Sequence, residues 1–250
     1  MRDPFFFYGP LRRPFYYSFR SLSRKHPGVF GINKKGTAVQ ASPQITADMA
    51  EKNQSGIIPG HHTGRIIDTV RSIECADTED AKTFFREVEK RLLQVNRWHE
   101  RMNGSPATFT VTDEEGREVD REVRQGDHFR ISIPGPGPSA GDGYDWVRVE
   151  EVRSVSGDDM ESTGIRVRPS GGPRKEDETI AHFYSEESTS NFTVTREGNR
   201  ITAGIYDRNT KPNTDAGLKD TARDLLIGLG AVAGFSRFQW DKLAEALLRR

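Results

Sequence analysis

The chain has 250 residues, of which 34% are hydrophobic and 30% are charged, a composition typical of a folded domain with polar loops and tails. Its formal net charge is zero, so the chain as a whole carries no excess charge that would attract nucleic acid or an acidic membrane surface. Cys75 is the only cysteine, which excludes an intrachain disulfide. A lone cysteine fits a reducing compartment, and we expect a cytoplasmic protein.

The charge is divided unevenly along the chain. Residues 1–36 contain eight basic side chains against Asp3 alone, a net charge of +7, which leaves −7 on residues 37–250. Nucleic-acid binding needs clustered lysines and arginines that contact phosphates. We therefore expect no nucleic-acid partner for the part of the chain that follows the basic segment.

The N-terminal quarter of the chain lacks a periodic pattern of apolar residues. Its first nineteen residues contain eight aromatic side chains and three prolines, and the prolines prevent a long helix. We expect residues 1–63 to form a basic, aromatic arm and linker without fixed structure, and residues 1–36 to be available for contact with a membrane surface or a protein partner. A translation start at Met49 is the alternative explanation of residues 1–48.

The first patterned elements follow Gly64. Residues 65–75 alternate in a way that predicts a β-strand. Asp77 or Thr78 then offers an N-cap for a helix. Apolar residues recur at steps of three and four over 81–98, which predicts one amphipathic helix or two short ones.

A series of short strands is expected next, because apolar and polar residues alternate between turn-forming stretches. Two stretches rich in proline, glycine or polar residues, 134–143 and 170–178, are expected to be loops. The segments with strand-like patterns are 107–112, 117–124, 127–133, 144–155, 164–168, 179–184, 190–196 and 200–207.

The C-terminal segment is predicted to be helical. Residues 215–232 present leucine, alanine and valine on one face, and the glycines that follow interrupt or end the helix. Ser236 and Gln239 form a capping box that predicts a last helix up to the C-terminus.

This order of elements, a strand, a helix pair, an antiparallel series and a C-terminal helix, predicts an α+β fold. It resembles the helix-grip fold of the StART-like (SRPBCC) superfamily, which includes polyketide cyclases, plant allergen-type ligand carriers and lipid-transfer domains. The matching stretches are 70–76, 77–102 and 215–250, with the run Leu93–His99 similar to the end of the helix pair. We therefore expect one helix-grip domain over 64–250, in which a curved sheet of about seven strands grips the last helix. An antiparallel β-barrel with terminal helices is the alternative.

The resemblance implies a small hydrophobic or amphipathic ligand in a cavity between the sheet and the C-terminal helix. Such cavities are mostly apolar with a few polar groups, so aromatic and histidine side chains of the predicted elements are the candidate lining residues. They are Trp98, His99, Phe129, Trp146, His182, Tyr184, Phe192, Tyr206 and Trp240.

No catalytic triad, metal cluster or phosphate loop stands out in the sequence, and we expect neither a cofactor nor a metal. The adjacent His61 and His62 have no Cys, Asp or Glu at a ligand-like spacing. Two other functions stay open. One is a cyclase-, hydrolase- or lyase-type enzyme on the same scaffold with His99 or His182 as acid or base, and the other is an interaction protein that uses the arm.

Overall fold

The structure is a computed structural model that describes residues 53–103, 105, 107–133, 141–173, 179–213 and 237–250. These residues belong to one compact unit that begins at Met49. Residues 1–52 of the predicted arm and linker, residues 134–140 and 174–178 of the two predicted loops, and the helix predicted over 215–232 with its glycines and the Ser236 cap lie outside the described residues.

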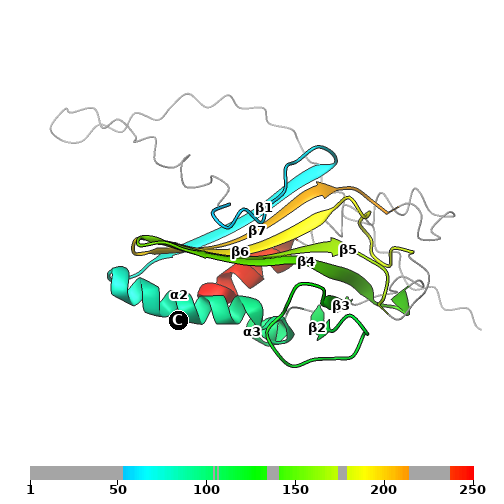
Figure 1. The fold of residues 1–250 in the computed structure, drawn as a ribbon, viewed down its shortest axis with the longest axis horizontal. Coiled ribbons are helices and arrows are strands. Elements are labelled where there is room, and N and C mark those ends of the chain that lie inside the picture. The colour runs from blue at the N-terminus through cyan, green and yellow to red at the C-terminus, as the bar shows by residue number, and fades with distance from the viewer. Residues whose placement is uncertain (1–52, 104, 106, 134–140, 174–178, 214–236) are drawn as a thin grey trace, which may run out of the picture. The chain divides into compact units, whose positions relative to one another are not determined.

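The described residues contain a seven-stranded antiparallel sheet with the strand order β1-β7-β6-β5-β4-β3-β2 (Figure 1). Each strand pairs only with its neighbours in this order, so β1 and β2 form the two edges of an open sheet. The strands are β1 (Arg65–Glu74), β2 (Thr108–Thr112), β3 (His128–Ser132), β4 (Asp145–Ser156), β5 (Met160–Pro169), β6 (Thr189–Glu197) and β7 (Arg200–Thr210).

Between β1 and β2 the chain forms the predicted helix pair. The long helix α2 (Thr78–Leu93) begins where the Asp77 side chain accepts a hydrogen bond from the main-chain N–H of Asp80 at 2.8 Å, which satisfies one free amide of the first turn. A 3-10 turn, η1 (Val95–Arg97), leads into the short helix α3 (Trp98–Arg101). The predicted helical segment is confirmed as two helices joined by a 3-10 turn, and Asp77 is the cap of the two that the sequence offered.

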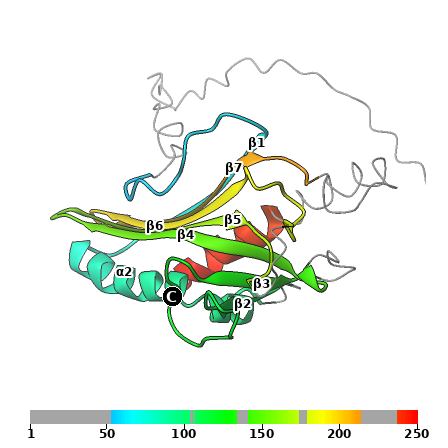
Figure 2. The same ribbon diagram turned by 45° about the vertical axis from the view of Figure 1, so that its right-hand side comes forward.

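Helix α2 and a second helix over 237–248 lie on the same face of the sheet, which curves over them (Figures 1 and 2). Their apolar faces share one core with the sheet, in which Leu92 and Leu243 are fully buried. The strand order, the curvature and this terminal helix are those of the helix-grip fold. The predicted helix-grip fold is thus confirmed, and the β-barrel alternative is wrong for the described sheet, whose edge strands do not pair with each other.

Two segments predicted as strands are not strands. Residues 117–124 make a single bridge, between Thr112 and Glu118. Further along this segment, Val123 N–H bonds to the carbonyl of Leu93 at the end of α2, so the segment crosses to the helix instead of pairing along the sheet. Residues 179–184 likewise form no strand: besides the bridge between Tyr184 and Pro212, their main chain makes single hydrogen bonds, such as those of Ala181 with Ser170 and Trp146.

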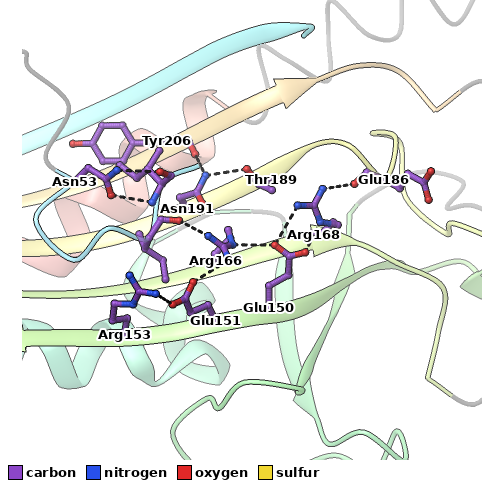
Figure 3. A network of polar contacts seen from close by, with 12 residues as sticks. Asn53, Glu150, Glu151, Arg153, Arg166, Arg168, Glu186, Thr189, Asn191 and Tyr206 are labelled. Carbon is purple, nitrogen blue, oxygen red and sulfur yellow. Dashed lines mark hydrogen bonds and ion pairs between the residues drawn. The ribbon is translucent and has the colours of Figure 1, made fainter. Parts of the chain in front are cut away.

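The opposite face of the sheet is crossed by residues 53–63, which the sequence assigned to the linker. Ile57 and Ile58 are buried there against Tyr206, and Arg166 donates to the Ile57 carbonyl at 3.0 Å. Figure 3 shows that the same arginine contacts two carboxylates of β4, Glu150 and Glu151, both at 2.9 Å. These contacts place residues 53–63 in the domain, so the domain begins before the expected Gly64.

Candidate ligand-binding cavity

A cavity lies between the sheet and the helix over 237–248, with a volume of about 40 Å³. All strands from β2 through β7 contribute lining residues, as do the segment that precedes β6 and the helix over 237–248. Its lining residues are Phe109, Phe129, Ile131, Ile133, Val147, Val167, His182, Phe183, Tyr184, Ser190, Phe192, Asp207, Gln239 and Trp240.

Aromatic rings form the floor of the cavity. Phe192 of β6 lies edge-on to Trp240 of the helix, with ring centroids 5.2 Å apart, and Phe109 lies 6.3 Å from the same indole. Below them, Trp98 packs on Phe192 at 4.9 Å and on Phe129 at 5.9 Å. Aromatic pairs favour such edge-on and tilted arrangements, so Phe109, Phe129, Phe192 and Trp240 form an aromatic wall of the cavity.

Asp207 supplies the cavity with a fully buried carboxyl group. The alternation of β7 turns Ile201, Ala203 and Ile205 toward the helices, and Asp207 follows at the next inward position, opposite Ser190 of β6. Trp240 Nε1–H donates to Asp207 Oδ2 at 3.1 Å, whereas Oδ1 has no hydrogen-bond partner. Burial raises the pKa of Asp207 to about 6, against the opposing effect of the Ser190 hydroxyl and the Trp240 indole.

His182 supplies a neutral imidazole to the same cavity. Its Nδ1 accepts the main-chain N–H of Tyr184 at 3.0 Å, which places the ring proton on Nε2. The ring stacks on Phe183 with centroids 4.2 Å apart. Burial lowers the pKa of His182 to about 3, so the imidazole stays uncharged at physiological pH.

The size of the cavity limits what it holds. Small-molecule sites usually enclose about 300–1,000 Å³, whereas the present volume is about 40 Å³, enough for a few water-sized groups. Among the lining residues, Ile133, Phe183, Ser190 and Trp240 are only half-buried, which indicates that the cavity reaches solvent on their side. A whole ligand needs more room than this, and Trp240 is the bulkiest half-buried side chain of the wall.

The structure brings five of the nine predicted site residues together. Phe129, His182, Tyr184, Phe192 and Trp240 all line the cavity, although they come from β3, β6, the segment before β6 and the last helix.

The other four predicted residues lie elsewhere. Trp98 is fully buried in the core beneath the cavity, where its indole N–H donates to the carbonyls of Arg91 and Leu92. His99 sits on α3 and does not line the cavity. Trp146 lines a separate pocket of about 250 Å³ beside Arg130 and Tyr144.

Tyr206 lies on the opposite face of the sheet from the cavity. Its ring packs so closely over Gly204 that a Cβ on that glycine would lie 2.4 Å from the ring. Neighbouring residues of a strand point to opposite faces, so Tyr206 and Asp207 cannot both face the cavity. The hairpin explains why: its two-residue turn pairs Phe192 with Ile205 and leaves Tyr206 opposite Asn191 on the outer face.

Sequence reasoning missed the polar members of the cavity, Ser190, Asp207 and Gln239. A signal for Asp207 was present, because it is a charged residue in register with the apolar inward positions Ile201, Ala203 and Ile205 of the same strand. A carboxylate at such a position is rarely buried without a role.

Within the described residues, no group of three or more His, Cys, Asp or Glu side chains is placed to hold a metal ion. Nor does that part of the chain contain a helix both long and apolar enough to cross a membrane.

No protein-family model and no curated protein matches the chain. Among solved structures it is similar to a hypothetical protein of Helicobacter pylori, jhp0584, with 12% identity over 76% of this chain and 90% of that chain and a TM-score of 0.41. It is also similar to norcoclaurine synthase from Thalictrum flavum, with 13% identity over 78% of this chain and 98% of that chain and a TM-score of 0.34. A third similar structure is the di-domain ARO/CYC protein BexL of the BE-7585A biosynthetic pathway, with 12% identity over 74% of this chain and 51% of that chain and a TM-score of 0.34. At such low identities and TM-scores, the likeness transfers no ligand and no activity to this chain.

Proposed function

We propose that the protein is a binding module for a small amphipathic molecule, held between the sheet and the helix over 237–248. The observation that supports this most directly is the cavity itself, which combines an aromatic wall with a few inward-facing polar groups. This combination is typical of small-molecule sites, where apolar contact provides affinity and sparse polar groups provide orientation.

Ligand entry requires Trp240 to move. The indole stands across the cavity, in contact with Phe192 and bonded to Asp207. Its displacement would add the volume of the largest natural side chain to the present space of about 40 Å³. The apolar part of a ligand would then replace the indole against Phe192, and its polar part would lie near Asp207 and His182.

Calorimetric titration with n-propylbenzene tests this proposal. We expect the wild-type chain to bind the probe, and Trp240→Ala to bind it at least about tenfold more tightly, because the alanine variant no longer has to displace an indole. Trp146→Ala is the matched control, since Trp146 lines a different pocket, and it should bind as the wild type does. If only Trp240→Ala binds, the wild-type cavity is an ordinary packing gap and the proposal is overturned.

Acid–base catalysis in the same cavity is a second candidate function. It is favoured by the presence of two titratable groups with displaced pKa values in one cavity, Asp207 at about 6 and His182 at about 3. A hydrolysis assay with 4-nitrophenyl acetate would reveal such an activity as a rate that rises with pH through about 6 in the wild type. Loss of that rise in Asp207→Asn would support the enzyme, and an equal rate in both proteins would exclude Asp207 as its base.

A further inference from the structure

Asp207 Oδ1 is a buried oxygen without a hydrogen-bond partner. The residue is fully buried; its second oxygen, Oδ2, accepts a bond from Trp240, and the carboxyl group also interacts with the Ser190 hydroxyl. An unsatisfied buried acceptor costs about 1–3 kcal/mol, and more when it is charged. Native structures retain few such groups, and each calls for an explanation.

Among the described residues that line the cavity there is no lysine or arginine. Arg208 bonds to the Asp68 carboxylate and to the main-chain carbonyl of Asp207. This arginine points to the outer face by the alternation of the strand, although it weakly opposes the rise in the Asp207 pKa. The imidazole of His182 is neutral. In the described part of the chain the carboxylate thus faces the cavity without a cationic partner among the lining residues, and its Oδ1 is available as an acceptor.

We propose, on the basis of the binding function above, that the ligand presents an O–H or N–H donor to Asp207 Oδ1, so that the cavity selects amphipathic alcohols and amines over carboxylates. A hydroxyl or ammonium group supplies the missing donor. A carboxylate instead brings a second negative charge to a buried one, and like charges in a low dielectric repel strongly.

The test uses four probes with the same phenylpropyl body: 3-phenylpropan-1-ol, 3-phenylpropylamine, 3-phenylpropionate and n-propylbenzene. Binding is measured by calorimetry at about pH 8, where a carboxyl group with a pKa near 6 is ionised. We expect the alcohol and the amine to bind the wild type at least about tenfold more tightly than the carboxylate, as a hydrogen bond to a charged group implies.

Asp207→Asn provides the sharpest variant. The amide oxygen still accepts the Trp240 N–H, which leaves the amide NH₂ to face the cavity as a donor. The preference should therefore reverse, with the carboxylate binding more tightly than the amine. Asp145→Asn is the matched control: Asp145 is also buried with its pKa raised to about 6, but it accepts from Phe183 N–H and does not line the cavity. This variant should keep the wild-type order.

The outcomes separate the two proposals. If n-propylbenzene binds but the carboxylate binds the wild type as well as the alcohol and the amine do, the donor rule is overturned and the binding function stands. An unchanged order in Asp207→Asn also overturns the rule. If none of the four probes binds, the binding function itself fails, and the donor rule fails with it.

Discussion

At the scale of single residues, Asp207 and Trp240 dominate the chemistry of the cavity. Their contact joins a strand of the sheet to the C-terminal helix through one hydrogen bond of 3.1 Å. The bond only partly offsets the burial of the carboxyl group, since the pKa of Asp207 remains raised to about 6. An ionised Asp207 therefore destabilises the folded protein, and the cavity is kept at a cost in stability.

This cost predicts a specific pH dependence. The folded pKa of Asp207 is about 6 and the unfolded value about 3.9, so between these values the folded state binds more protons than the unfolded state. The contribution of Asp207 to stability is thus fully present below about pH 4 and is lost as pH rises through about 6. Asp207→Asn removes the titration and should gain stability relative to wild type by up to about 3 kcal/mol across this window.

Denaturant unfolding of both proteins at several pH values between about 4 and 8 measures the effect. Histidines whose pKa is lowered, His128 to about 4 and His182 to about 3, change stability in the opposite direction. Both histidines are present in both proteins, so their effects cancel in the difference between the unfolding free energies of wild type and Asp207→Asn. If the unfolding free energies of wild type and Asp207→Asn change in parallel with pH, ionisation of Asp207 does not destabilise the folded protein.

At the scale of elements, Arg91 connects α2 to the end of the last helix. Its guanidinium donates to the main-chain carbonyls of Leu247 at 2.9 Å and Arg249 at 2.5 Å, which are among the carbonyls left free at a helix end. Arg91 is itself buried. The helix that closes the cavity is therefore held at its C-terminal end by a side chain from the other helix.

Arg91→Met should lower the free energy of unfolding by about 2 kcal/mol or more, because it removes the charged donor from the carbonyls of the buried Leu247 and of Arg249. Arg86→Met on the exposed side of α2 is the control and should change stability by no more than about 0.5 kcal/mol. Thermal or denaturant unfolding compares the two variants, and equal effects would show that the Arg91 contacts contribute nothing to stability.

The elements differ in how far the sequence predicts them. β1 and the Asp77 cap follow from local patterns, namely alternation and a side chain that caps its own helix. Residues 117–124 and 179–184 also alternate, but their pairing depends on which segment is near in space, and here they meet the end of α2 and the loop after β5. Local alternation does not specify a pairing partner.

In the candidate site too, local sequence predicts some features, whereas others depend on how the strands pair. The aromatic residues Phe129, Phe192 and Trp240 were predicted because large rings favour cavities and cores alike, whereas the face on which a ring lies depends on register. Tyr206 shows how strand register decides which face a ring occupies. Once the turn at Gly198-Asn199 is assigned, the register of the hairpin places Tyr206 opposite Asn191, away from Phe192.

At the scale of the whole domain, the two faces of the sheet have different coverings. The inner face packs on the helices and contains the cavity, whereas residues 53–63 cross the outer face and bury Ile57 and Ile58 against Tyr206. Burying an isoleucine contributes about 1.5–3 kcal/mol. The outer segment thus stabilises the same sheet that the cavity depends on.

Two shortened chains test this contribution. A chain that begins at Gly64 should be less stable than one that begins at Asn53 by about 3 kcal/mol or more, since it loses both buried isoleucines. In the full chain, Ile57→Ala should cost about 2–4 kcal/mol, and Ile66→Ala, which is 52% exposed, no more than about 0.5 kcal/mol. Equal stability of the two shortened chains would contradict a structural role for residues 53–63.

Because the two faces of the sheet are so distinct, methyl NMR with added 3-phenylpropan-1-ol can locate ligand binding between the sheet and the helix over 237–248. We expect saturable shifts at the cavity methyls of Ile131, Val147 and Val167, while Ile57 and Ile58 on the outer face stay unchanged. Shifts confined to the outer face, or none at saturating alcohol, would contradict binding at this site.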